Sequence, residues 1–429
     1  MAKNTKLDLR GQLMYSVFVR NHTKEGTFRA LVDDLDRIAA LGTDIIWLMP
    51  IHPIGKVARK GELGSPYAIS DYRGINPEYG TKEDLIHLVQ QIHERGMKCI
   101  IDVVYNHTAP DSVLADIHPE YFFCDADGHP SRHVADWWDI VDLQYTDRGL
   151  WDYQIETLKM WAGIVDGFRC DVASMVPVDF WCEAREAVAQ VNPECIWLAE
   201  SVFQDHVRGM RAQGAYSATD SELYAAFDIT YPYDVWDAFD GYFNGTNTLG
   251  EYIRVLNFQE GVYPGNYVKL RCLENHDQPR FAGRVESDAE LRSWMALSYF
   301  ERGTTMLYAG EEFGAEKAVG LFDKDDNFGD IREDWQAYLK LLRQMKRRLP
   351  LTGEYRLDCR GEEFVVGKYN SPEGKVRGIF SMKGASGDLF VDLPDGVYRD
   401  LVDGREVAVC GGFAHTDGEP VIIAKEEAK

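Results

Sequence analysis

The chain has 429 residues, of which 45% are hydrophobic and 27% are charged, a composition typical of globular proteins. It carries 46 lysines and arginines against 70 aspartates and glutamates, and the resulting net charge of −24 argues against binding to nucleic acid or to an anionic membrane surface. The sequence has no apolar run of about 18 residues that would span a membrane, and residues 1–11 have no signal-peptide pattern, so we expect a cytoplasmic protein. The eight cysteines form no Cys-x-x-Cys pair, which indicates reduced thiols.

Short apolar segments alternate with segments of helical periodicity over the first 350 residues. The expected strands are residues 12–19, 44–48, 98–104, 165–169, 195–199, 224–228, 268–273 and 305–308. The expected helices are residues 27–41, 81–95, 149–162, 177–191, 288–302 and 334–349. Thr81 followed by Asp84 is typical of a helix N-cap. Eight strands that alternate with helices predict a (β/α)8 barrel, an α/β fold whose parallel strands are buried on both faces.

Two stretches depart from this alternation. Residues 107–147 are rich in aspartate, histidine, glycine and aromatic residues, and they are too long for an ordinary loop. After Pro350, short alternating segments separated by turn residues predict a small antiparallel β domain. The predicted organisation is a barrel from residues 1–106 and 148–350, a short inserted domain from 107–147, and a C-terminal β-sandwich from 351–429.

Polar side chains gather at the C-terminal ends of the predicted strands, where barrel enzymes carry their active sites. They are Asp102, Asn106 and His107 at the end of the third strand, Arg169 and Asp171 at the end of the fourth, Glu200 at the end of the fifth, and His276 and Asp277 after the seventh. A buried Arg–Asp pair by itself has a purely structural explanation. The joint arrangement of three of these carboxylates, Asp171, Glu200 and Asp277, with two histidines and an arginine indicates a catalytic site.

Two carboxylates suffice to cleave a glycosidic bond. One protonates the leaving oxygen, and the other attacks the anomeric carbon or activates water. A third carboxylate could stabilise the positive charge of the transition state. A neighbouring cation would keep a carboxylate ionised, whereas crowding by other anions would raise the pKa of the acid.

Four motifs carry a resemblance to a known family. They are DVVYNH at 102–107, GFRCD at 167–171, WLAE at 197–200 and ENHD at 274–277. Weaker matches follow the same order along the chain, and they are GINPEYGT at 74–81, IVDLQ at 140–144 and GTTMLYAGEE at 303–312. In sequence and placement these motifs resemble the α-amylase family of glycoside hydrolases. The family's architecture of a barrel, an excursion after strand three and a C-terminal β domain matches the predicted organisation.

The resemblance implies a catalytic role for each matching residue. Asp171 would be the nucleophile, Glu200 the acid and then the base, and Asp277 the transition-state stabiliser that holds sugar hydroxyls. Arg169 would keep Asp171 ionised and oriented. The implied reaction is retaining hydrolysis through a covalent glycosyl-enzyme intermediate, for which the two reacting carboxyl groups should lie about 5–5.5 Å apart.

The resemblance also implies substrate-binding residues. Tyr67 would stack on the sugar ring, and His107 and His276 would hydrogen-bond its hydroxyls. Asp102 would support the site. Trp137, Trp138 and Phe203 are further candidates for sugar stacking, with buried packing as the alternative for each.

The reaction needs no cofactor, although a structural calcium is possible. In calcium-binding relatives the metal lies between the excursion and the residue that matches Asn106. Residues 125–128 resemble a calcium loop but lack the bidentate glutamate, so an Asp-Gly turn is the better interpretation.

The preferred substrate is a maltooligosaccharide or soluble α-glucan, and several alternatives stay open. Val172 resembles the residue of α-1,6-acting relatives, whereas IVDLQ departs from the oligo-1,6-glucosidases. An α-glucan transglycosylase would use the same site. A non-catalytic partner subunit would lack the carboxylates, which are present here, and a metal-dependent hydrolase would need more ligands than His107 and His276. The sequence does not indicate an oligomeric state.

Overall fold

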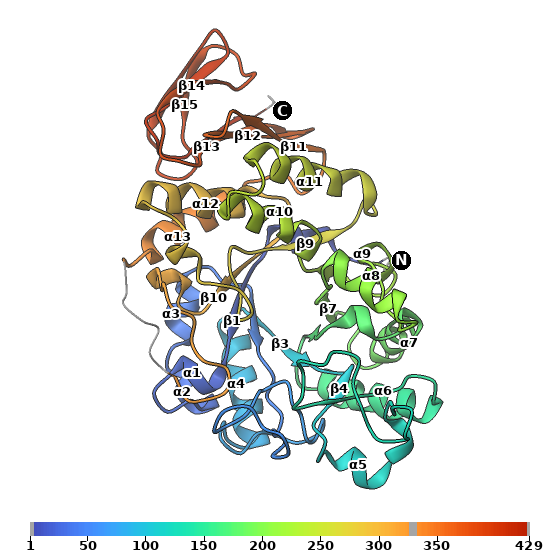
Figure 1. Cartoon of the computed structure of the whole chain (residues 1–429). Coiled ribbons are helices and arrows are strands. Elements are labelled where there is room, and N and C mark those ends of the chain that lie inside the picture. Colours follow the sequence, from blue (N-terminus) through green and yellow to red (C-terminus); the bar gives the residue numbers. More distant parts are fainter. Residues whose placement is uncertain (1–3, 326–332, 427–429) are drawn as a thin grey trace. The chain divides into compact units, whose positions relative to one another are not determined.

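The computed structural model describes residues 4–325 and 333–426. Eight parallel strands form a closed barrel in the order β1-β10-β9-β8-β7-β6-β3-β2 (Figure 1). These strands are β1 (Leu13–Val17), β2 (Ile45–Leu48), β3 (Lys98–Val103), β6 (Gly167–Cys170), β7 (Ile196–Ala199), β8 (Ile229–Thr230), β9 (Val268–Arg271) and β10 (Thr304–Tyr308). Nearly every residue in them is buried, as expected for parallel strands covered on both faces. The predicted (β/α)8 fold is therefore confirmed.

The helices follow the predicted alternation closely. They are α1 (Val19–His22), α2 (Phe28–Val32), α3 (Leu35–Ala40), α4 (Lys82–Glu94), α5 (Val113–Ile117), α6 (Arg148–Ala162), α7 (Val178–Val188), α8 (Gln204–Ala212), α9 (Asp220–Leu223), α10 (Tyr233–Phe243), α11 (Leu249–Val262), α12 (Asp288–Phe300) and α13 (Gln336–Lys346). Thr81 caps α4 as expected, because its side chain accepts from the Asp84 N–H and the Asp84 carboxylate accepts from the Thr81 N–H.

The predicted sixth strand at residues 224–228 is wrong. Thr219 and Glu222 form a capping box that starts α9, and helical hydrogen bonds continue as far as the Phe227 N–H, which donates to the Leu223 carbonyl. The strand β8 follows at Ile229–Thr230. The apolar residues 224–227 form a helical turn and are largely buried, as the residues of a strand would also be. Their apolar character therefore did not distinguish a strand from a helix.

The predicted helix at residues 27–41 is divided into α2 and α3. The break lies at Asp33 and Asp34. The Asp34 carboxylate accepts hydrogen bonds from Arg37 and is bonded to the His22 ring. These side-chain hydrogen bonds fix Asp34 in the middle of the predicted helix. The segment therefore bends at Asp34 and forms two helices in place of one.

Residues 107–147 form an excursion between β3 and α6. Its strands β4 (His107–Thr108) and β5 (Val141–Asp142) pair antiparallel. Residues 125–128 form the expected turn, since the Gly128 N–H donates to the Asp125 carbonyl and Gly128 has a φ of 82°. This small sheet places His107 at the junction of the barrel strand and the excursion.

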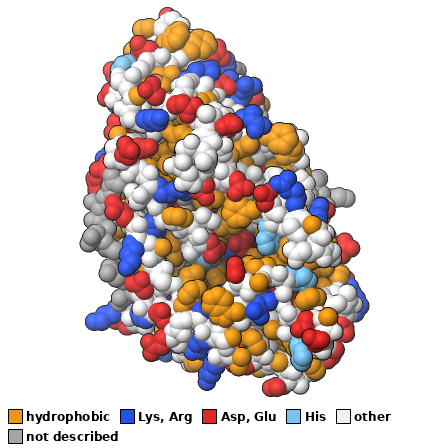
Figure 2. All heavy atoms as spheres, viewed as in Figure 1, with side chains coloured by type: hydrophobic (Ala, Val, Ile, Leu, Met, Phe, Trp, Pro, Cys, Tyr) orange, Lys and Arg blue, Asp and Glu red, His pale blue; other side chains and the backbone are white. Residues whose placement is uncertain are grey.

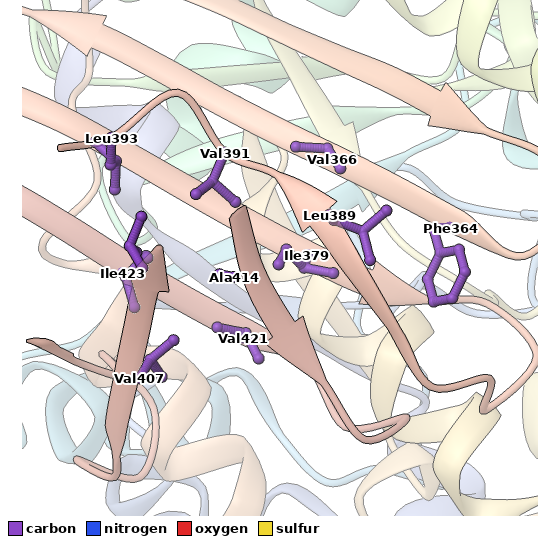
Figure 3. Packing of buried hydrophobic residues seen from close by; sticks show 11 residues of the cluster. Phe364, Val366, Ile379, Leu389, Val391, Leu393, Val407, Ala414, Val421 and Ile423 are labelled. Atoms are coloured by element: carbon purple, nitrogen blue, oxygen red, sulfur yellow. The ribbon is translucent and has the colours of Figure 1, made fainter. Parts of the chain in front are cut away.

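The C-terminal part of the chain forms two antiparallel sheets, in the orders β11-β12-β13-β18 and β14-β17-β16-β15. Their strands are β11 (Glu354–Arg360), β12 (Phe364–Ser371), β13 (Gly374–Ser381), β14 (Gly387–Phe390), β15 (Gly396–Arg399), β16 (Glu406–Cys410), β17 (Phe413–Thr416) and β18 (Val421–Glu426). Both sheets contribute side chains to one apolar cluster, including Val366, Ile379 and Val421 from the first and Leu389 and Val407 from the second (Figure 3). The predicted antiparallel β domain is confirmed.

The described chain divides into two compact units. The first consists mainly of residues 14–234, with 318–325, and the second of residues 235–317 with the C-terminal sheets. Within the second unit the β domain packs on α11 and α12. The Asn257 side chain donates to the Leu357 carbonyl at 2.7 Å, and the Phe300 ring contacts the rings of Tyr369 and Phe380. No described helix is long and apolar enough to cross a membrane.

Candidate active site

The centre of the candidate site is Arg169 on β6, which is fully buried. Strand register explains its neighbours, because Asp102 on β3 lies opposite Arg169, and Cys170 lies opposite Ala199, the residue before Glu200. Arg169 Nη1 lies 2.9 Å from Asp102 Oδ1 and 2.8 Å from Asp171 Oδ1. Its Nη2 lies 2.9 Å from Glu200 Oε2. One guanidinium therefore holds three carboxyl groups, which we call the carboxylate cluster.

The charges in this cluster are strongly coupled. Burial would lower the pKa of Arg169, but Asp102 and Glu200 raise it well above its ordinary value. Burial raises the pKa of Asp102 to about 8, with Asp171 acting in the same direction and Arg169 opposing them. Asp102 therefore keeps a proton to a higher pH than an ordinary aspartate does.

Val172 has an unusual backbone that shapes the site. It has a φ of 33° and a ψ of 46°, in the left-handed region that β-branched residues seldom adopt. In this conformation the Val172 N–H donates to Glu200 Oε2 at 2.8 Å. Glu200 Oε2 accepts from the Val172 N–H and lies 2.9 Å from Arg169 Nη2, so a proton on Glu200 is best carried by its other oxygen, Oε1. The Val172 side chain packs with Met175, Val202 and Val207.

Tyr67 and His107 lie next to the carboxylate cluster. The Tyr67 hydroxyl donates to Asp102 Oδ2 at 3.2 Å, and its ring centroid lies 5.7 Å from the Arg169 guanidinium carbon. His107 Nε2 lies 3.9 Å from Asp171 Oδ2. The structure thus brings together Tyr67, Asp102, His107, Arg169, Asp171 and Glu200 within the first compact unit.

His276 and Asp277 follow β9 in the second compact unit. His276 Nε2 lies 3.1 Å from Asp277 Oδ2, and the Asp277 N–H donates to the Asn275 side chain at 2.9 Å. The His276 side chain is buried, whereas that of Asp277 is 43% exposed. Their roles in catalysis stay predictions from the sequence.

Two aromatic residues beside the carboxylate cluster were not predicted as site residues from the sequence. Trp47 at the end of β2 and Tyr231 just after β8 lie 5.1 and 5.3 Å from the Arg169 guanidinium carbon, measured to the ring centroids. Both are buried, so they exclude water from the cation and strengthen its interactions with the carboxylates. Trp47 is the penultimate residue of its apolar strand, as Arg169 is of β6, and this shared position was a signal that the sequence offered. Tyr231 was missed because the sixth strand was predicted at residues 224–228, and Tyr231 did not follow the end of that predicted strand directly.

A structural calcium at Asn106 stays a prediction from the sequence. The Asn106 amide nitrogen lies 3.2 Å from His107 Nδ1. Over residues 4–325 and 333–426, no group of three or more histidine, cysteine, aspartate and glutamate side chains could hold a metal ion.

The eight cysteines are free, and burial raises the pKa of the Cys170 thiol well above its ordinary value, as expected for an inert core residue.

A barrel whose strand ends bring several carboxyl groups around one buried arginine defines a class of carbohydrate-cleaving enzymes. A family model described as the α-amylase catalytic domain matches residues 12–138 and 133–351, and one described as the bacterial α-amylase C-terminal domain matches residues 356–423. The chain belongs to the α-amylase family of glycoside hydrolases.

Individual relatives agree with this assignment. The crystal structure of an α-amylase from Lactobacillus plantarum is 45% identical, covers 98% of this chain and 100% of that one, and superposes with a TM-score of 0.95. A maltogenic α-amylase from Thermotoga neapolitana is 31% identical over 98% of this chain and 100% of that one, with a TM-score of 0.86. An α-1,4-glucan:maltose-1-phosphate maltosyltransferase from Rhodospirillum rubrum is 34% identical over 46% of this chain and 31% of that protein. The chain spans about half the length, or less, of such curated relatives.

Proposed function

We propose that this protein is a retaining α-glucosidic hydrolase that cleaves maltooligosaccharides and soluble α-glucans. The observation that carries the proposal is the binding of Asp171 and Glu200 to the two terminal nitrogens of the Arg169 guanidinium. This shared partner favours the short separation of carboxyl groups found in retaining enzymes over the wider gap that accommodates a water molecule in inverting ones.

In the first step, Asp171 attacks the anomeric carbon and Glu200 protonates the leaving oxygen. Asp171 is suited to attack because Arg169 Nη1 donates to its Oδ1 at 2.8 Å and holds the carboxyl group in position. Glu200 is suited to donate from Oε1, because Arg169 and Val172 occupy Oε2. In the second step, Glu200 takes a proton from water as the water oxygen attacks the anomeric carbon and displaces the Asp171 carboxylate, which releases the sugar with its original anomeric configuration.

The remaining site residues act on the sugar without making or breaking its bonds. His107 donates a hydrogen bond to a ring hydroxyl beside Asp171, and Asp277 holds hydroxyls as positive charge develops on the ring. Tyr67 offers a ring face to the sugar while its hydroxyl stays on Asp102. The substrate is neutral, which agrees with a surface on which acidic and basic side chains are interspersed (Figure 2). No cofactor is needed for these steps.

The test is proton NMR of the first product formed from a maltooligosaccharide. The α-anomer should appear first and mutarotate later, and an initial β-anomer would contradict the proposal. Asp171→Asn should lose turnover, because the amide is a poor nucleophile. A circular dichroism spectrum like that of the unmodified chain is the control for its folding.

Transfer to a second sugar is the other candidate reaction, because several curated relatives are named maltosyltransferases. An acceptor hydroxyl would then replace water at Glu200. Products longer than the substrate, in a time course on maltotriose, would favour transfer.

A further inference from the structure

Three aromatic residues near the site are candidates for sugar stacking, and the structure separates them. Trp137 is partly buried, and its ring centroid lies 5.5 Å from that of His107. Phe203 stacks on Tyr233 at 4.6 Å and 11°, so one of its faces is covered. Trp138 is different, because it is 54% exposed. An indole this open to water can offer a ring face to a ligand.

Trp138 is held in place by Lys60. The Lys60 Nζ lies 4.5 Å from the Trp138 ring centroid, a distance at which the cation is attracted to the ring. The same Nζ lies 2.9 Å from Asp139 Oδ1, and the side chains of Lys60 and Asp139 are only 17% and 4% exposed. This ion pair is therefore largely shielded from water, and it fixes the cation against one side of the indole.

The loop that carries Lys60 is itself anchored. The N–H groups of Leu63 and Gly64 both donate to the Phe322 carbonyl at 3.0 Å, and the Glu62 N–H donates to Asp323 Oδ1 at 2.6 Å. The Phe322 ring centroid lies 5.9 Å from Lys60 Nζ. Because these hydrogen bonds hold the loop just after Lys60, the cation is kept in position beside the indole.

Trp138 is adjacent in the chain to a residue that borders the candidate active site. It follows Trp137, whose ring contacts His107, and His107 Nε2 lies 3.9 Å from Asp171 Oδ2. Neighbouring Cα atoms are about 3.8 Å apart, so the backbone that carries the exposed indole lies one residue from a ring that borders the site.

We propose that Trp138, fixed by Lys60 and Asp139, is the stacking platform for a glucose unit remote from the bond that is cleaved. The apolar face of a pyranose would lie on the open face of the indole, and its hydroxyls would remain in water or bond to neighbouring polar groups. This inference rests on the proposed function and names the part of an α-glucan that the platform holds: a unit that only longer chains possess.

A protein partner is a poorer match to this surface. A specific interface needs about 800 Å² on each partner, with few charges at its centre. Here a charged pair, Lys60 with Asp139, lies directly beside the ring. A sugar ring needs only the indole face, and it tolerates charged neighbours as hydrogen-bond partners.

The test is the ratio of kcat/KM for maltoheptaose to that for maltotriose, measured for the unmodified chain and for Trp138→Ala. The ratio should fall about tenfold in the variant, mainly through KM, because only the longer substrate has the remote glucose units that the proposed platform would hold. Trp138→Tyr keeps a ring and should restore most of the ratio. Phe258→Ala is the matched control, because Phe258 on α11 is 65% exposed and unconnected with the proposed platform. It should leave the ratio unchanged.

A Trp138→Ala ratio equal to that of the unmodified chain would overturn the proposal, as would an equal loss on both substrates. If the thermal unfolding midpoint of Trp138→Ala is unchanged, the loss is an effect on binding and not on folding. A second readout is the affinity of Asp171→Asn for maltoheptaose, followed by tryptophan fluorescence. Adding Trp138→Ala to that variant should weaken the affinity. If the unmodified chain cleaves neither substrate, the proposed function itself fails, and that result is distinct from a ratio that does not respond to Trp138.

Discussion

Gly167 is the residue at which a single added methyl group should damage the site most directly. It is the first residue of β6 and lies opposite Ile196 on β7. A Cβ at this position would lie 2.4 Å from the Ile196 carbonyl oxygen and 2.9 Å from the Ile196 nitrogen, whereas ordinary van der Waals contact begins near 3.4 Å. These atoms are backbone, so relief requires the two strands to move apart by about 1 Å.

The size of the effect follows from this displacement. Overpacking of a buried site costs about 1–3 kcal/mol, and we expect Gly167→Ala to lower the free energy of unfolding by about 3 kcal/mol because both clashing partners are main chain. Arg169 and Asp171 lie two and four residues further along the chain. A misplacement of about 1 Å at reacting groups costs roughly a hundredfold in rate, so kcat/KM should fall about a hundredfold.

Urea denaturation and initial rates on maltoheptaose measure the two effects. Gly209→Ala is the matched control, since Gly209 lies within α8 and a Cβ there would meet no atom within 4 Å. Alanine in a helix interior should stabilise that variant by about 0.5–1 kcal/mol without a change in rate. A Gly167→Ala protein with unchanged stability and rate would refute the strand-contact reasoning.

The remaining predictions concern pH and metal ions. Burial raises the pKa of Asp34, but hydrogen bonds from His22 and Arg37 outweigh burial and lower this pKa to about 2. The ionised Asp34 therefore stabilises the fold above the pKa that it has in the unfolded chain, and this contribution to the free energy of unfolding is lost as the pH falls toward 2. Asp34→Asn should therefore lower the free energy of unfolding by about 2 kcal/mol at pH 7 and by about 1 kcal/mol at pH 3; an equal loss at both would contradict this ion pair. EDTA should change neither rate nor thermal midpoint, and a midpoint lowered by EDTA and restored by calcium would show a metal site.

Much of the site could be predicted because its residues are polar at positions where strands are apolar. Asp102, Arg169, Asp171 and Glu200 each end or follow a buried strand, and parallel strands in register bring such residues together. The structure places the three carboxyl groups around the guanidinium of Arg169. The capping signal at Thr81 was local, and local signals of this kind survive in the folded chain.

The rest depended on contacts that the sequence does not display. A left-handed backbone at Val172 is unfavourable in isolation, so only the surrounding structure, with its bond to Glu200, makes it possible. The apolar residues 224–227 are compatible with a strand or a helical turn, and the capping box that decided between them was overlooked. The exposure of Trp138 follows from the position of Lys60, 78 residues earlier in the chain.

The central claim is that Asp171 forms a covalent bond to the sugar, and trapping that bond tests it most directly. Glu200→Gln incubated with α-glucosyl fluoride can form the intermediate, because fluoride leaves without protonation, but it lacks the base that would hydrolyse the ester. Peptide mass spectrometry should then find one glucosyl group on the peptide that contains Asp171, and Asp171→Asn should carry none. A glucosyl group on another carboxylate, or no adduct together with release of β-glucose, would contradict the account.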